Sequence, residues 1–271
     1  MSTAFVSEKF PVHLWLHEAS LAGCYLYSAA KSSSVDWARE FVAAKSGQEM
    51  YSLEPEDFHA RGITFLGPVL ARARSAIVSS RQAADVVRRE CADGPPILVL
   101  PLAFPVVPAV YVPPARRVVS VGWLAPNKRP AVLVHLAARL GVDVSFVGPV
   151  LDPVADEMRA LAVRLGVAER IEITGRLPQN DFDRVVASAR VGVQLRTGSI
   201  GQRSAAVNDL VARGIPVVTD VLDEGAGAIV PVDIVGLDDA SAADVVAAAI
   251  GDLLDDDVQW FAASQIGRAH V

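Results

Sequence analysis

Lysine, cysteine and long apolar runs are scarce in this 271-residue chain, and each shortage narrows the range of functions. Only four of the 25 basic residues are lysines, and Lys128 is the single lysine after residue 45. No apolar run reaches the ~18 residues that span a bilayer, so we expect no transmembrane segment. The N-terminus shows no secretory signal pattern, and Cys24 and Cys91 form no cluster, which favours two buried thiols in a reducing cytoplasm.

The net charge and the absence of several motifs exclude further classes of function. A net charge of −6 without a basic stripe argues against a nucleic-acid partner. The sequence has no GxSxG serine, no Cys–His pair and no cluster of metal ligands, so we expect neither a covalent nucleophile nor a metal or bound cofactor. His13 and His17, four residues apart on a strand, would lie ~13 Å from each other, too far to share an ion.

From residue 117 onward, short apolar segments alternate with segments of helical period. Strands are predicted at 118–121, 142–147, 171–174, 191–195, 215–219 and 229–232, and helices at 129–140, 153–165, 179–188, 202–213 and 241–254. Gly214 is expected to end the fourth of these helices. Strands separated by helices of about 10–15 residues form βαβ units. Because these strands are apolar throughout, as in VSFVG, we predict a doubly wound α/β domain with a parallel sheet.

Residues 1–104 follow a looser version of the same pattern. Strands are predicted at 11–17, 75–80 and 96–104, and helices at 21–31, 34–45 and 81–91. The stretch PVVPAVYVPPARR (105–117) holds four of the 17 prolines and has no helical period. We therefore predict a partial N-terminal Rossmann-like domain at 1–104, a linker at 105–116 and a C-terminal Rossmann-like domain at 117–263.

Both ends of the chain leave alternatives open. The N-terminal domain begins almost directly with a strand, so either it is small or the sequence begins inside a longer gene. The final IGRAHV continues a helical pattern, but one reading frame of a common sequencing adapter encodes the same residues. Residues 264–271 are thus either native helix or a non-native tail.

Lys128 is the first candidate for ligand binding. Ligands of open parallel sheets bind beyond the carboxyl ends of the strands. Gly122 follows such a strand, and Lys128 stands near the start of the next helix. Free N–H groups at a helix start and a nearby lysine suit a phosphate, although the stretch is neither a Walker A loop nor GxGxxG. The alternative is a solvated lysine on an ordinary loop.

The helix predicted at 202–213 is the second candidate. Gln202 and Asp209 are seven residues apart and would share one helix face. A carboxylate among small and apolar residues is costly unless a polar ligand, such as a ribose diol or a sugar, satisfies it. Alternatively, Asp209 pairs with Arg213 one turn later. The small residues of 197–201 would let a ligand approach the backbone closely.

The stretch HLWLHEASL (13–21) is the third candidate. On a strand, His13, Trp15 and His17 share one face, and the intervening leucines point to the other. His17, at the end of the strand, is either a polar contact to a ligand or a hydrogen-bonded core histidine. A fourth stretch, DEGAGAIV (223–230), is a glycine turn between two strands.

Together these stretches resemble the retaining glycosyltransferases of GT-B fold, of the glycosyltransferase family 4 type. VGWLAPNK (121–128) is similar to the family element VGRLxxxK, with Trp123 in place of the arginine. VQLRTGSIGQRSAAVNDLVARGIPVV (193–218) resembles the nucleotide-binding segment that in one variant reads GESSxxxxD before AxGxP. WLHEASL (15–21) resembles LHDxxL. The resemblance covers 117–255 and, as the later part of an N-terminal domain, about 10–104.

The resemblance implies two Rossmann-like domains facing across a cleft, with a nucleotide-sugar held by the C-terminal one. Lys128 would bind the donor diphosphate, Asp209 the ribose hydroxyls, and Gln202 would replace a glutamate that contacts the sugar. His17 would reach the transferred sugar, and with Lys128 it would be catalytic. The implied donor-binding residues are Gly122, Lys128, Thr197, Gly198, Gly201, Gln202, Arg203, Ser204 and Asp209.

The expected function is transfer of a sugar from a nucleoside diphosphate sugar to an acceptor hydroxyl, with retained anomeric configuration and without a metal. Lys128 and a helix N-terminus would stabilise the leaving diphosphate. The expected setting is cytoplasmic carbohydrate biosynthesis, with the donor and an unknown hydroxyl acceptor as partners and peripheral membrane contact left open. The alternatives are a nucleotide-sugar epimerase of the same fold, or a nucleotide-binding or scaffolding protein without activity. An NAD-dependent oxidoreductase is disfavoured because GxGxxG is missing.

Overall fold

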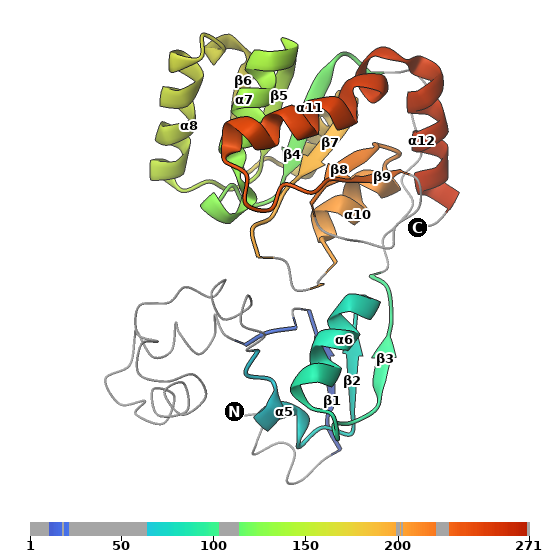
Figure 1. Ribbon diagram of the computed structural model, residues 1–271. Helices are drawn as coiled ribbons and strands as arrows, with labels where there is room; N and C mark the ends of the chain where they lie inside the picture. Colours follow the sequence, from blue (N-terminus) through green and yellow to red (C-terminus); the bar gives the residue numbers. More distant parts are fainter. Residues whose placement is uncertain are drawn as a thin grey trace. The chain divides into compact units, whose positions relative to one another are not determined.

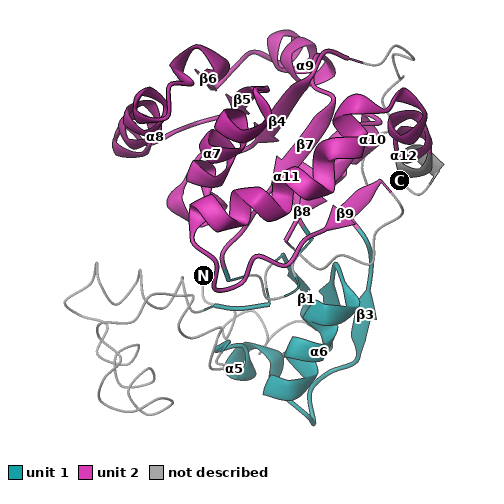
Figure 2. Ribbon diagram, turned by 45° about the horizontal axis from the view of Figure 1, so that its top comes forward, with its two compact units in different colours: residues 1–101, 198–203 teal, residues 102–197, 204–271 magenta. Residues whose placement is uncertain are grey.

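The computed structural model describes residues 11–17, 19–21, 64–102, 114–198, 201, 203–220 and 228–269 (Figure 1). The chain divides into two compact units. Unit 1 comprises residues 1–101 and 198–203, and unit 2 comprises residues 102–197 and 204–271 (Figure 2). Most of the predicted linker and of the helices expected before residue 46 lies outside the described residues. The predicted domain boundaries therefore stay predictions.

Unit 1 contains a parallel sheet of three strands within its described part, in the order β1-β2-β3. Its elements are β1 (His13–Leu16), α5 (Gly67–Leu70), β2 (Ser75–Val78), α6 (Arg81–Glu90) and β3 (Ile97–Val99). Ser80 begins α6, because its hydroxyl accepts a hydrogen bond from the N–H of Ala83 at 3.0 Å. Both helices contribute to the core, with Leu70 from α5 and Val87 from α6 packing on the strands.

Unit 2 contains a six-stranded parallel sheet in the order β6-β5-β4-β7-β8-β9. The strands are β4 (Arg117–Val121), β5 (Asp143–Val147), β6 (Ile171–Gly175), β7 (Val191–Gln194), β8 (Val217–Thr219) and β9 (Ile229–Pro231). Counted within the unit, the order is 3-2-1-4-5-6, which is the strand order of dinucleotide-binding Rossmann sheets. The predicted doubly wound fold is confirmed.

Helices cover both faces of the unit 2 sheet. They are η2 (Pro126–Lys128), α7 (Pro130–Leu140), α8 (Asp152–Arg164), η3 (Ala168–Arg170), α9 (Gln179–Ala187), α10 (Ala205–Ala212), α11 (Asp239–Asp255) and α12 (Asp257–Ala269). Along β4, Val118 packs in a core with α7, α8 and α11, whereas Val119 and Val121 pack in a second core with α9 and α10. Alternate side chains of one strand therefore fill two separate cores.

One expectation about the two cysteines is wrong. Cys91 is only partly buried, so the prediction of a fully buried thiol is wrong for this residue, because it ends α6 near the unit surface. Cys24 lies outside the described residues. The helices that the structure describes include none that is long and apolar enough to cross a bilayer.

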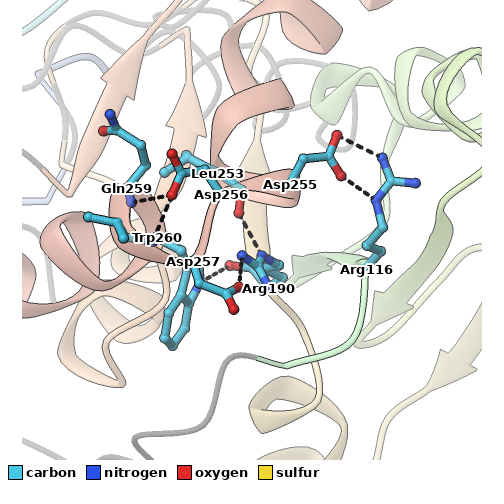
Figure 3. A network of polar contacts seen from close by, with 9 residues as sticks. Arg116, Arg190, Leu253, Asp255, Asp256, Asp257, Gln259 and Trp260 are labelled. Carbon is cyan, nitrogen blue, oxygen red and sulfur yellow. Dashed lines mark hydrogen bonds and ion pairs between the residues drawn. The ribbon is translucent and has the colours of Figure 1, made fainter.

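A buried arginine anchors the last helix to the sheet (Figure 3). Arg190, directly before β7, donates through Nε to the carbonyl of Leu253 at 2.7 Å and through Nη2 to Oδ1 of Asp257 at 2.6 Å. In return, Nε1 of Trp260 donates to the carbonyl of Arg190 at 2.8 Å. The Arg190 side chain is only 7% exposed, so these contacts compensate its removal from water.

Arg190→Ala is expected to lower the free energy of unfolding of the chain by about 2–3 kcal/mol, because charge-assisted hydrogen bonds and packing under Trp260 are lost together. Urea denaturation followed by circular dichroism measures the change. The matched control is Arg116→Ala, whose ion pair with Asp255 is exposed on both sides and should cost less than about 1 kcal/mol. Equal losses in the two variants would show that Arg190 does not anchor the helix.

Candidate functional site

The candidate site lies at the carboxyl ends of the unit 2 strands, at the point where the direction in which successive strands are added to the sheet reverses. This reversal falls between β4 and β7, the first and fourth strands of the unit. Crossover connections run to opposite faces on the two sides of such a point, so the loops after both strands border it. Within unit 2 these loops are 122–129 after β4 and 195–197 after β7. They contain Gly122, Lys128 and Thr197 of the donor-binding residues that the sequence suggests.

Gln194 fixes the geometry of this point. Backbone pairing between β4 and β7 joins Val118 to Val191 and Val119 to Gly192. Towards the carboxyl ends of the two strands, the buried side chain of Gln194 replaces this backbone pairing. Its amide oxygen accepts from the N–H of Val121 at 2.6 Å, and its amide nitrogen donates to the carbonyl of Val121 at 3.2 Å. A side chain thus supplies the hydrogen bonds that a strand would otherwise provide.

Glycines end three neighbouring strands and bring their loops close together. Gly122, Gly148 and Gly175 follow or end β4, β5 and β6, and all have positive φ, at +102°, +143° and +67°. The N–H of Gly148 donates to the carbonyl of Gly175 at 3.1 Å. A Cβ on Gly148 would lie 2.7 Å from the carbonyl carbon of Gly122, whereas a Cβ on Gly122 would meet no atom within 4 Å. Gly148 is therefore needed for close packing of two loops, and Gly122 faces open space.

Lys128 lies in a partly buried position within the loop after β4. It ends the short helix η2, and its N–H donates to the carbonyl of Ala125 at 2.9 Å. Burial lowers the pKa of the Lys128 ammonium, the nearby charge of Arg196 lowers it further, and Asp220 partly offsets both. An ammonium that is short of water and faces another cation favours a bound anion.

The loop that carries Lys128 is held in place by the next residue. Arg129 has left-handed backbone geometry, with φ +48°, which is unusual for a residue with a side chain. Its guanidinium donates to Oδ1 of Asp239 at 2.8 Å and to the carbonyl of Leu237 at 2.8 Å, on the segment that leads into α11. Pro130 then begins α7 without an N–H. The free helix N–H groups expected beside Lys128 are thus fewer than the sequence suggested, because a proline fills the first position.

Arg196 and Asp220, which sequence reasoning missed, lie close to Lys128. The N–H of Arg196, two residues after β7, donates to Oδ1 of Asp220 at 2.7 Å, and Asp220 directly follows β8. The N–H of Thr197 donates to the carbonyl of Asn127 at 2.9 Å. The loop after β7 is therefore bonded to the loops after β4 and β8, and Lys128, Arg196 and Asp220 form one group, called here the cation cluster. The only sequence signal was their position just after a strand or in the loop beyond it.

The predicted start of the helix that carries Asp209, at residue 202, is wrong. Helix α10 begins at Ala205, because Ser204 caps it with a hydroxyl that accepts from the N–H of Val207 at 3.4 Å. Gln202 itself lies outside the described residues. The predicted end is confirmed, since Gly214 follows the last turn with φ +77°.

Asp209 is paired within the protein. Its Oδ1 accepts from Nε of Arg213 at 3.3 Å, which is the i, i+4 pair that the sequence offered as the alternative to a ligand. Arg213 is held more tightly by Asp183 of α9, at 2.7 Å, and lies over the Phe182 ring. The Asp209 side chain stays 29% exposed, so its carboxylate remains accessible to a ligand.

The remaining candidate residues divide between the units. Thr197 and Ser204 belong to unit 2, whereas Gly198, Gly201 and Arg203 belong to the segment grouped with unit 1. Within unit 1, the hydroxyl of Ser80 donates to the carbonyl of Gly201, and the N–H of Arg203 donates to Oγ of Ser79 at 3.3 Å. A Cβ on Gly201 would lie 2.6 Å from the N–H nitrogen of Ala83, so this glycine is required for a close approach to α6.

His17 of unit 1 is exposed just after β1, and its ring stacks with that of Trp15 at 6.0 Å between centroids. The shared face of His13, Trp15 and His17 is confirmed, and the alternative of a core histidine is wrong, because this face of the strand is open to solvent. Among the described residues, no group of three or more His, Cys, Asp or Glu side chains could hold a metal ion. Gly225 and Gly227 of the predicted glycine turn lie outside the described residues.

The pKa of Asp220 should make the free energy of unfolding depend on pH, with a sign that is specific to a carboxyl whose pKa is raised by folding. Burial raises the pKa of its carboxyl above the unfolded value of 3.8, although the N–H of Arg196 and the charges of Arg129 and Lys128 favour ionisation. The folded protein thus keeps a proton that the unfolded chain has lost. Relative to Asp220→Asn, the wild type should lose stability as the pH rises through the window between the unfolded and the folded pKa.

Urea unfolding of wild type and Asp220→Asn, from below the usual aspartate pKa of about 4 up to neutral pH, measures this difference. A wild-type advantage that grows as the pH rises across this window would contradict the assignment, since it would mean that folding lowers the pKa of Asp220.

Comparisons with known proteins identify the fold. No family model matches the chain, and no curated protein sequence is similar to it. Among solved structures, Anabaena HepE in complex with UDP and glucose has 14% identity and a TM-score of 0.67. Sucrose-phosphate synthase from Thermosynechococcus elongatus has 17% identity and a TM-score of 0.64. The pneumococcal O-GlcNAc transferase GtfA, in complex with UDP and GlcNAc, has 14% identity and a TM-score of 0.58.

Coverage differs among these structures. The match spans 98% of this chain and 67% of HepE, 98% of this chain and 64% of the synthase, and 74% of this chain and 42% of GtfA. The chain therefore spans about two thirds or less of the length of these proteins. With its parallel sheets and strand order, the chain has the α/β fold of the GT-B glycosyltransferases.

Proposed function

We propose that this chain transfers a sugar from a nucleoside diphosphate sugar to an acceptor hydroxyl, with retention and without a divalent metal. The observation that carries the proposal is the cation cluster at the point where the unit 2 sheet reverses its strand order. Support comes from the likeness to HepE and GtfA, whose solved structures hold UDP. The cytoplasmic location and the role in carbohydrate biosynthesis stay predictions.

In this proposal, positively charged side chains of the chain stabilise the leaving diphosphate in place of a metal ion. As the bond between sugar and diphosphate breaks, negative charge grows on the leaving phosphate oxygens. Lys128 would stabilise this charge from a partly buried position, where electrostatic interactions are stronger than in water. The exposed backbone at Gly122 leaves room for the phosphates beside it. No carboxylate is assigned as a covalent nucleophile.

The remaining donor contacts follow the same proposal. Asp209 would hold the ribose hydroxyls, while the ion pair with Arg213 orients its carboxylate. Gln202 and His17 would contact the transferred sugar. The loop before α10 would border the donor with four residues, Gly198, Gly201, Arg203 and Ser204. Thr197, which is exposed after Arg196, would also border the donor.

A second candidate is nucleotide binding without transfer. Two observations favour it: the Asp209 carboxylate is already paired with Arg213, and Trp123, 59% exposed, brings no charge to the loop after β4. An epimerase of the same fold stays an alternative, because it would bind the same donor.

Calorimetric titration with UDP, GDP and their sugars tests the proposal, followed by mass spectrometry of acceptor mixtures for a new glycoside. Asp209→Ala should weaken binding of UDP by about 10-fold, or 1.4 kcal/mol, because two ribose hydrogen bonds are lost. The matched control is Asp183→Asn, which removes the stronger partner of Arg213 but touches no ligand.

Equal losses in Asp209→Ala and Asp183→Asn would assign Asp209 a structural part only. Binding without any transfer product from any donor would favour the second candidate. A folded protein that binds no nucleotide would overturn both.

A further inference from the structure

Strands β4 and β7 separate before they end. In the described part of unit 2, their last backbone pair joins Val119 to Gly192. On its other side, β4 stays paired with β5 as far as Val121, which lies opposite Val147. Continued by two residues, the pairing of β4 and β7 would place Val121 opposite Gln194. At this level the Gln194 side chain, rather than the backbone, joins the two strands.

The peptide group that begins the loop after β4 is held from both sides. Its N–H, on Gly122, donates to the carbonyl of Val147 on β5 at 2.9 Å. Its oxygen, on Val121, accepts from the Gln194 amide at 3.2 Å. The backbone of Gln194 pairs in turn with Thr219 of β8. The Gln194 side chain, in a residue only 3% exposed, thus joins β7 and β8 to the first peptide of this loop.

The far end of the same loop is also bonded to the segment that follows β7. The N–H of Thr197, three residues after Gln194, donates to the carbonyl of Asn127 at 2.9 Å. Between these points Leu124 is buried, whereas Gly122 has a φ of +102° and open space around it. Since Gly122 has no side chain to restrict its backbone, the hydrogen bonds of the preceding peptide group decide its conformation.

We propose that Gln194 is a positioning residue for the donor: its amide keeps Gly122 in the conformation that receives the donor phosphates, and it does not touch the donor. This inference rests on the proposed function. A neutral amide suits the position because it offers one acceptor and one donor to the N–H and the carbonyl of Val121. A loop that is ordered beforehand loses little conformational freedom when the donor binds, so the affinity is higher.

Calorimetry on the full chain, with UDP as the probe, tests the inference. Gln194→Met keeps the length of the side chain but not its hydrogen bonds. It should weaken UDP binding by about 10-fold, the size expected when about one residue must be ordered on binding.

The matched control is Ser145→Ala in β5, because Ser145 is 1% exposed and its hydroxyl donates to Oε2 of Glu172 at 2.7 Å. This variant also loses a buried hydrogen bond of the sheet, yet it should bind UDP within about twofold of the wild type.

Gln194→Glu supplies a readout that a general loss of stability would not move. A protonated carboxyl offers one donor and one acceptor, as the amide does, whereas a carboxylate offers acceptors only. Burial should raise the pKa of the new carboxyl above its usual value of about 4.3. The UDP affinity of Gln194→Glu, divided by that of the wild type at the same pH, should therefore rise towards one as the pH falls. Charged groups around the strand ends, among them Lys128, Arg196 and Asp220, are common to both proteins and cancel in this ratio.

Each outcome decides the matter. If the wild type binds UDP and a folded Gln194→Met binds it equally well, Gln194 does not position the loop, and the proposed function stands without it. If Ser145→Ala loses as much affinity as Gln194→Met, the effect is a general one of the sheet and the inference is wrong. If Gln194→Met does not fold, as judged by circular dichroism, Gln194→Glu decides, and an affinity ratio that does not change with pH overturns the inference. A folded wild type that does not bind UDP overturns this inference and the proposed function together.

Discussion

Lys128→Ala is expected to reduce the rate of sugar transfer by about 10²- to 10³-fold, the effect of removing one group that stabilises a leaving oxyanion. The reason is that Lys128 is partly buried, where its charge interacts with a leaving phosphate more strongly than it would in water. It is also the only lysine in the last 226 residues of the chain. Donor consumption and glycoside formation, measured at saturating donor, give the change in kcat.

The control for this prediction is Arg159→Gln on α8, whose ion pair with Asp156 is exposed on both sides. It removes a positive charge of the same unit without touching the site. Lys128→Arg should recover part of the donor affinity, because the charge remains while its geometry changes. A Lys128→Ala enzyme with more than about a third of the wild-type kcat would remove Lys128 from the catalytic step.

Gly148→Ala is expected to cost unit 2 more than about 3 kcal/mol and to leave little folded protein. The added Cβ would lie 2.7 Å from the carbonyl carbon of Gly122 and closer still to its oxygen, and both atoms are backbone that cannot rotate away. The φ of +143° is also disfavoured for any residue with a side chain. Soluble yield and urea unfolding followed by circular dichroism measure the loss.

Gly122→Ala is the matched control, because it lies on the other side of the same contact. Its φ of +102° brings backbone strain, but the new Cβ would meet no atom within 4 Å. Its cost should therefore stay near the strain alone, about 1–2 kcal/mol. If both variants were equally stable, the close approach of the loops after β4 and β5 would not be a requirement of the fold.

The sheet of unit 2 could be predicted from sequence because its signals are periodic. Every predicted strand and helix from residue 117 onward is present, with ends that differ by at most three residues. The differences have local causes. Helix α10 begins after its capping Ser204, and β8 begins late, because the N–H of Ile215 still bonds to the carbonyl of Leu210 and Pro216 has none to donate.

The candidate site was less accessible to sequence reasoning. Lys128 stood out because lysine is rare, and the glycines because they follow strands. Arg196 and Asp220 come from separate loops, and no pattern in the chain shows that two loops will share hydrogen bonds. For Asp209, the sequence was compatible both with a ligand contact and with an ion pair to Arg213. The structure shows that the ion pair forms.

The central strand pair has a consequence for the order of folding. Val118 of β4 pairs with Val191 of β7, 73 residues later, but with Val144 of β5 only 26 residues later. Closing the longer loop costs about 1 kcal/mol more in chain entropy. The β4-β5-β6 half should therefore assemble first and serve as the template on which β7 docks. Pulsed hydrogen exchange during refolding would detect this as protection of Val144 and Phe146 before Val193 and Val218, and simultaneous protection would show instead that the sheet forms in one step.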